Sequence, residues 1–289
     1  MGTVLSLAVC LQLWGADAAH AGTVEQNVTI NGQSSGGSDK ETINQAPMGM
    51  PLTNRGKETI NKAPVGMPKI HLIPTPSELF KWKRVPGVAY DIGVGADGTA
   101  WHIGTNDTIW RMVNGSWKKI AGTASVISVD PRGNAWVVDR KGGIFRYDGK
   151  TWVRVPGKAY DIGVGADGTA WHIGTSDTIW RMVNGSWKQI AGTATKIAVA
   201  PDGNAWVVDR KGGIFRYDGK TWVRVPGMAT DIGVSANGTA WHIGRGDSIY
   251  RWDGKNSWEK IRGSASVIAG AEGTTAWVVN RAHQIWAEE

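Results

Sequence analysis

Short runs of alternating apolar and polar residues follow one another along most of the chain. In the stretch after Tyr90, four such runs read DIGVG, TAWHIG, TIWRMV and WKKIAG. The letters ADG separate the first two runs, and NGS separates the last two. The dipeptides Asp-Gly and Asn-Gly in these letters favour tight hairpin turns, because Gly98 and its counterparts tolerate a positive φ. Alternation with a period of two between turn signals predicts antiparallel strands. Four strands within 35 residues leave no room for a helix, so the pattern predicts an all-β fold.

The same pattern returns at a regular interval. A period in this range is typical of solenoids and propellers, and a four-stranded antiparallel sheet repeated around an axis is a propeller blade. We therefore predict a six-bladed β-propeller of four-stranded antiparallel blades over residues 80–289. The tryptophans that mark its units stand 35, 35, 35, 35 and 36 residues apart, at Trp82, Trp117, Trp152, Trp187, Trp222 and Trp258.

The strand pattern also predicts how the ring closes. The last unit has three strand signals, VIAGA, TAWVV and QIWAEE, and lacks a fourth. A surplus strand signal, FKWKRV, stands at residues 80–85. We expect this N-terminal strand to complete the last blade, because that arrangement removes an exposed strand edge and ties together the two ends of the array.

A second period of 70 residues is superimposed on the first. The stretch DIGVGADGTAWHIG at 91–104 returns unchanged at 161–174 and nearly unchanged at 231–244. Odd blades carry AWHIG and IWRM, whereas even blades carry AWVVD and IFRY. The ring is therefore expected to consist of three copies of a two-blade unit, with approximate threefold symmetry.

Composition supports a strand-rich fold and argues against one class of partner. The chain has 40 Gly, 17 Trp and 3 Phe, and a net charge of +7. Lys and Arg are spread through the repeats instead of being clustered on one face or in a tail, so we expect no nucleic-acid partner.

The N-terminal residues predict secretion. Val4 to Trp14 is an apolar run too short to span a bilayer, and Ala19-His20-Ala21 offers a small-x-small cleavage site. We expect a signal peptide at 1–21, an extracellular protein and no membrane insertion. Cys10 is the one cysteine and lies in this segment, so the mature chain would have no disulfide, thiolate metal site or cysteine nucleophile.

Residues 22–79 are rich in Gly, Ser, Asn and Pro and poor in aromatic residues. Within them KETINQAPMGMP at 40–51 is echoed by KETINKAPVGMP at 57–68. Too few apolar side chains are present to offset the entropy of ordering this segment, which predicts a disordered linker with a duplicated phrase.

The repeated phrases resemble tectonin repeats. The residues that carry the resemblance are a Trp opening W.RVPG.A or WK.I.G.A, followed by DIGVG, G.AW.I and I.R, over residues 82–289. The family includes fish-egg lectins, horseshoe-crab lectins and fungal tectonins. The resemblance implies a six-bladed propeller that binds carbohydrate at several similar sites, with lipopolysaccharide and O-methylated sugars among the ligands of some members.

Candidate binding residues follow from the alternation. A His in the odd blades replaces a Val in the even ones, so it either forms structural hydrogen bonds or contacts a ligand. The following Arg either packs its stem on an aromatic ring or binds sugar hydroxyls, carboxylates or phosphates. The small polar loop residues between the His and the Arg either form turns or recognise hydroxyls. The predicted carbohydrate-binding residues are His102, Asn106, Asp107, Trp110 and Arg111, then His172, Ser176, Asp177, Trp180 and Arg181, then His242, Asp247, Tyr250 and Arg251.

The strand-two tryptophans are expected to pack between blades, because they occur in every unit. They are Trp101, Trp136, Trp171, Trp206, Trp241 and Trp277.

The predicted function is that of a secreted, multivalent lectin that recognises cell-surface glycans. Several weak sites on one ring bind a dense glycan surface tightly through avidity. The alternatives are a propeller enzyme of the streptogramin-lyase type and a protein-binding scaffold. An enzyme needs a singular acid or base, and every candidate here is copied two to six times, so we predict no catalytic residue, no metal site and no cofactor.

Overall fold

The computed structural model describes residues 6–7, 28–29 and 82–289. The chain divides into two compact units, Met1–Lys69 and Ile70–Glu289. In the first unit, β1 (Ser6–Leu7) pairs antiparallel with β2 (Val28–Thr29). The predicted signal peptide and linker lie almost entirely outside the described residues, as do Phe80 and Lys81, and both segments stay predictions.

Two sheets of the second unit have four strands each. The first has the order β4-β5-β6-β7 and contains β4 (Asp91–Val94), β5 (Ala100–Ile103), β6 (Thr108–Val113) and β7 (Ser116–Thr123). The other has the order β22-β23-β24-β3 and contains β22 (Val267–Gly270), β23 (Ala276–Val279), β24 (Gln284–Glu288) and β3 (Trp82–Val88).

Two further sheets have seven strands each. The first contains β8 (Val126–Val129), β9 (Ala135–Val138), β10 (Gly143–Tyr147), β11 (Trp152–Val164), β12 (Ala170–Gly174), β13 (Thr178–Val183) and β14 (Ser186–Thr193). The second contains β15 (Lys196–Val199), β16 (Ala205–Val208), β17 (Gly213–Tyr217), β18 (Trp222–Val234), β19 (Ala240–Gly244), β20 (Ser248–Trp252) and β21 (Trp258–Ser264). Every regular element of the described residues is thus a strand.

The long strands β11 and β18 explain the seven-stranded sheets. The first half of each is the fourth strand of an even repeat, and the second half is the first strand of the next odd repeat. We number the repeats 1 to 6 by their first strands: β4, β8, the second half of β11, β15, the second half of β18, and β22.

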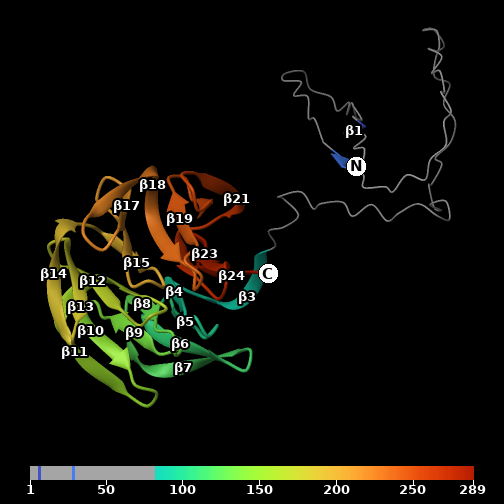
Figure 1. The fold of residues 1–289 in the computed structure, drawn as a ribbon. Coiled ribbons are helices and arrows are strands. Elements are labelled where there is room, and N and C mark those ends of the chain that lie inside the picture. The colour runs from blue at the N-terminus through green and yellow to red at the C-terminus, as the bar shows by residue number, and fades with distance from the viewer. Residues whose placement is uncertain (1–5, 8–27, 30–81) are drawn as a thin grey trace, which may run out of the picture. The chain divides into compact units, whose positions relative to one another are not determined.

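The first strands of the repeats contact one another in a cycle. Strand β4 contacts β8, β8 contacts β11, β11 contacts β15, β15 contacts β18, β18 contacts β22, and β22 contacts β4 again. Figure 1 shows the sheets of residues 82–289 arranged around this common axis, with β3 beside β24. In that pairing Val85 lies opposite Ile285 and Arg84 lies opposite Trp286. The fold is a β-propeller.

The turns have the backbone geometry that their sequences predict. Gly98 has a φ of 78°, as expected for the ADG turn, and Asp97 accepts a hydrogen bond from the Thr99 amide at 3.0 Å. Asn114 and Gly115 both have a positive φ, 49° and 75°. Two consecutive positive values define the type I′ hairpin turn, which matches the twist of the flanking strands.

The core lies between neighbouring repeats. Trp101, Trp171 and Trp241 are fully buried, and the first two donate from Nε1 to the carbonyl oxygens of Gly133 and Gly203 in the next repeat, both at 2.9 Å. Trp136 and Trp206 are buried as well, and Trp277 packs half-buried on the cluster around Ile285. The predicted core role of the strand-two tryptophans is confirmed.

Candidate functional site: the rim clefts between repeats

The strand-four tryptophan of each repeat is hydrogen-bonded to the repeat before it. Each indole Nε1 donates to a carbonyl oxygen near the end of the preceding fourth strand, at 2.6 or 2.7 Å. The pairs are Trp82 with Arg262, Trp117 with Pro86, Trp152 with Ala121, Trp187 with Pro156, Trp222 with Ala191, and Trp258 with Pro226.

We give the name rim cleft to the place beside each of these tryptophans, where the fourth strands of two successive repeats meet; the one beside Trp82 is a cavity of about 400 Å³. The strand-four Trp, the strand-three aromatic residue and the strand-two residue of one repeat line it, and the end of the preceding fourth strand closes it. Gly87 shows how tightly the two sides approach: its φ is 116°, and a Cβ at this position would lie 3.2 Å from Trp117 Nε1. This position of the repeat therefore requires Gly.

The rim clefts of the odd repeats contain the predicted histidines. The His102 ring stacks on Trp110, with centroids 6.1 Å apart and an angle of 11°, and meets Trp117 edge to face at 4.3 Å. His102 is 3% exposed, and its Nδ1 has no hydrogen-bond partner among the described residues. Burial lowers the pKa of His102 to about 4, so the ring is neutral at physiological pH.

The other two histidines repeat this geometry. His172 stacks on Trp180, and His242 stacks on Tyr250 with centroids 4.7 Å apart. The pKa of each is likewise lowered to about 4 by burial. The three odd clefts are thus one chemical class.

The rim clefts of the even repeats are a second class. A Val takes the histidine slot, and an Arg from the fourth strand lies over the strand-three ring. The Arg154 guanidinium carbon is 5.3 Å from the Phe145 centroid, and that of Arg224 is 5.2 Å from the Phe215 centroid. In repeat 6 the corresponding distance, from Arg84 to Trp286, is 5.8 Å.

The predicted arginines lie on the opposite face of each odd sheet from the histidines. His102 pairs with Trp110 across the strands, whereas Arg111 pairs with Trp101. Neighbouring residues of a strand point to opposite faces, so His102 and Arg111 cannot share a cleft. The guanidinium carbons of Arg111, Arg181 and Arg251 lie 5.3, 5.3 and 5.8 Å from the buried tryptophan rings beside them.

The predicted loop aspartates join each odd repeat to the next even repeat. Asp107 forms a bidentate ion pair with Arg140, with 2.7 Å between Oδ1 and Nη2, and the pair lowers the pKa of Asp107. Asp177 pairs in the same way with Arg210, and Asp247 with Arg281. Asn106 and Ser176 lie exposed at the tips of these loops.

The predicted set is therefore divided among three places. In each odd repeat the histidine and the strand-three ring line the rim cleft, the arginine packs on the opposite face of the sheet, and the loop aspartate binds an arginine of the next repeat. Contact of any of these residues with a carbohydrate stays a prediction.

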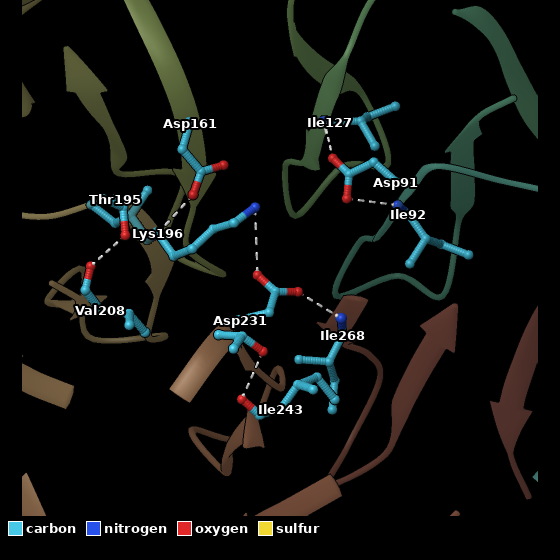
Figure 2. A network of polar contacts seen from close by, with 12 residues as sticks. Asp91, Ile92, Ile127, Asp161, Thr195, Lys196, Val208, Asp231, Ile243 and Ile268 are labelled. Atoms are coloured by element: carbon cyan, nitrogen blue, oxygen red, sulfur yellow. Dashed lines mark hydrogen bonds and ion pairs between the residues drawn. The ribbon is translucent and has the colours of Figure 1, made fainter. Parts of the chain in front are cut away.

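A polar cluster on the axis was missed by the sequence reasoning. Asp91, Asp161 and Asp231 begin the first-strand motif DIG of the odd repeats, and Lys196 begins β15 (Figure 2). Lys196 Nζ lies 3.7 Å from Asp231 Oδ1, beside a cavity of about 90 Å³. The available signal was Lys196 itself, because Val126 and Val267 occupy its slot in the other even repeats.

Each axial carboxylate also connects two repeats. Oδ2 of Asp91, Asp161 and Asp231 accepts a hydrogen bond of 2.8 Å from a backbone amide at the start of the next repeat. Burial raises the pKa of Asp91 to about 7 and that of Asp161 to about 6, and Asp161 and Asp231 raise the pKa of Lys196. Protein surrounds Lys196, yet its side chain is 40% exposed where it borders this cavity.

Replacement of Lys196 by Val, the residue of the sister repeats, should destabilise the protein in a pH-dependent way. A raised carboxyl pKa stabilises the folded state fully below about 4, and that contribution is lost as the pH rises toward 7. Lys196 offsets the negative charge that the axial carboxyl groups acquire as they lose their protons. We expect Lys196→Val to cost about 1–2 kcal/mol at pH 8, between the values for exposed and buried ion pairs, and much less at pH 4.5.

Urea denaturation at the two pH values measures this difference. Lys188→Val, at an exposed lysine, is the matched control and should show little cost at either pH. An equal loss at pH 4.5 and pH 8 for Lys196→Val would show that the axial charges do not interact as described.

Two classes of feature are absent from the part of the chain that the structure describes. Residues 6–7, 28–29 and 82–289 contain no helix long and apolar enough to cross a bilayer. They also contain no group of three or more His, Cys, Asp or Glu side chains placed to hold a metal ion.

Solved structures with this fold are diverse. The gluconolactonase XC5397 from Xanthomonas campestris superposes with a TM-score of 0.57 at 14% identity, over 72% of this chain and 89% of that one. The WD40 β-propeller domain of Doa1 gives 0.54 at 13% identity, over 69% and 78%. YCF48 bound to D1 peptide gives 0.53 at 15% identity, over 75% and 97%. At these identities the likeness shows the fold alone.

The family comparison is more specific. No curated protein matches the sequence. The model of the tectonin domain matches residues 125–289, more than half of the chain and the greater part of the repeats. This protein belongs to the tectonin-domain family.

Proposed function

We propose that the protein is a secreted, multivalent lectin built on a six-bladed ring that β3 closes. The cyclic contacts of the first strands and the pairing of β3 with β24 support this architecture. The six Trp hydrogen bonds between successive repeats, that of Trp82 included, support it further. Glycans on cell surfaces are the proposed ligands, with lipopolysaccharide and O-methylated sugars as candidates.

The observation that carries this proposal is the aromatic lining of the odd rim clefts. The half-buried rings of Trp110 and Trp117 offer apolar faces for the C–H groups of a sugar, and His102 is buried against both. Aromatic rings with nearby polar groups at the edge are what recognition of a polyhydroxylated ligand requires. Because the arrangement occurs three times, weak single sites would add up to tight binding to a dense surface, by roughly 10²–10⁴-fold.

An enzyme is the alternative function. A catalytic group built once would stand out from the repeats, and Lys196 is such a residue on the axis of residues 82–289. Its cavity of about 90 Å³ is smaller than the 300–1,000 Å³ typical of small-molecule sites. The axial cluster therefore fits a structural role better than a catalytic one.

A glycan-array screen of the full chain tests the proposal, followed by conversion of odd clefts to the even type. We expect selective binding to a family of glycans. The variants His102→Val, His172→Val and His242→Val, combined one, two and three at a time, should lower the avidity stepwise, by about tenfold for each cleft lost. Val137→Ala, in an even cleft, is the control. An array without any bound glycan, or complete loss through one of the three substitutions alone, would overturn the proposal.

A further inference from the structure

One rim cleft differs from its sisters in the charge and in the aromatic residue of its lining. In the even clefts of repeats 2 and 4, the carbonyl that accepts the Trp hydrogen bond belongs to an Ala and the strand-three residue is Phe. The loop between the second and third strands begins with an Asp in both repeats. In the cleft of repeat 6 these residues are Arg262, Trp286 and Asn280. Because the repeats are otherwise so regular, these three substitutions give the cleft of repeat 6 a different chemical lining from the clefts of repeats 2 and 4.

Two of these departures change the charge in the same direction. Ala to Arg262 adds a positive charge, and Asp to Asn280 removes a negative one. The structural role of each position is kept: the Arg262 carbonyl accepts from Trp82 Nε1 at 2.7 Å, and Asn280 Oδ1 accepts from the amides of Ala282 and Gln284 at 3.0 and 2.9 Å. Asp139 holds its loop in the same way. Loop and strand structure therefore do not require either change.

The altered cleft is a cavity of about 400 Å³. Trp82 and Trp286 provide its aromatic walls, and Arg262, Ser264 and Asn280 provide its polar groups. This volume lies within the range of small-molecule sites and accommodates one sugar ring.

Arg262 is the cation of this cavity that is available to a ligand. Its side chain is exposed, and within residues 82–289 it forms no ion pair. Arg84, by contrast, lies over Trp286 and donates to the carbonyls of Ile285 and Gly87, both at 3.1 Å. Asp247, the acidic residue of the adjoining loop, is occupied by Arg281.

We propose that the cleft of repeat 6 is a single site for an acidic sugar. The sugar ring lies against Trp82 and Trp286, and its anionic substituent, a carboxylate, sulfate or phosphate, pairs with Arg262. A guanidinium binds such oxyanions through charge-assisted hydrogen bonds. The inference rests on the proposed function in taking the ligand to be a sugar, and it assigns to this one cleft a ligand class that the neutral odd clefts do not favour.

The test is calorimetry on the full chain, with indole NMR signals of Trp82 and Trp286 as the readout of position. The probes are methyl glucuronide, glucose 6-sulfate and glucose 6-phosphate, with methyl glucoside as the neutral twin and inorganic sulfate and phosphate as simple anions. We expect one site for at least one acidic sugar, shifts confined to the two indoles, binding at least about tenfold tighter than the neutral twin, and weakening by salt.

Variants copied from the sister clefts keep the fold and isolate the cation. Arg262→Ala should weaken acidic-sugar binding about tenfold, and Asn280→Asp should weaken it in the same direction. Ala121→Arg combined with Asp139→Asn should create a second site in repeat 2. Equal affinity for the neutral twin, unchanged binding by Arg262→Ala, or binding of the simple anions alone would overturn the inference.

The two proposals fail separately. One outcome is that the chain binds neutral glycans on the array, loses that binding when the odd-cleft histidines are replaced, and has no acidic-sugar site. This result would overturn only the proposal for the cleft of repeat 6. A single acidic-sugar site on a chain that binds no neutral glycan overturns only the odd clefts.

Discussion

Deletion of residues 22–88 will lower the melting temperature by about 10–20 °C, whereas deletion of residues 22–78 will leave it within about 2 °C of the full chain. The longer deletion removes β3, so β24 loses its partner and becomes an exposed edge. It also removes Val85 from the cluster around Ile285, and Trp82 from its hydrogen bond to repeat 5. Together these contacts contribute about 5 kcal/mol, which corresponds to that shift in a domain of this size.

Thermal denaturation followed by circular dichroism compares the two truncations. Equal melting temperatures would show that the β3 strand does not stabilise the ring. A large fall for the shorter deletion as well would mean that residues before β3 also support the domain.

Trp171→Ala will destabilise the domain by about 3–5 kcal/mol. Its ring is fully buried against Tyr217 and Trp222, with centroids 5.5 and 6.3 Å away, so truncation leaves a large cavity. The change also removes the hydrogen bond to the Gly203 carbonyl and the ring beneath Arg181.

Urea denaturation measures this loss against Tyr160→Ala, which changes an aromatic residue that is 58% exposed. The control should cost under about 0.5 kcal/mol. A cost below about 1 kcal/mol for Trp171→Ala would contradict the view that these tryptophans form the core between repeats.

The 70-residue period has a structural explanation. Between each odd repeat and the next even repeat, one strand ends and a new strand begins. Asp107 or its counterpart connects the two repeats by an ion pair with an arginine. From repeats 2 and 4 to the next odd repeat, β11 and β18 continue without a break. The odd-to-even junctions thus have a side-chain ion pair, and two of the three even-to-odd junctions have a continuous strand. At the third, β3 and β4 are separate strands.

The strands and the core could be predicted because they depend on local patterns. Alternation, turn residues and the recurring Trp locate the strands, and the family resemblance drawn from the same phrases is confirmed by the tectonin-domain match. The arrangement of the candidate binding residues could not be predicted in the same way. His102 and Arg111 are near neighbours in sequence, but strand alternation places them on opposite faces. The axial cluster was missed since it joins Asp91, Asp161, Asp231 and Lys196 from four repeats, a contact that exists only once the ring has formed.

Calorimetric titration of the full chain with a neutral monovalent glycan taken from the array tests the central claim most directly. The account predicts about three equivalent sites, one for each odd cleft, and about two after His172→Val. Six equal sites, or a single site, would contradict it and leave the alternation of repeats as a feature of the fold alone.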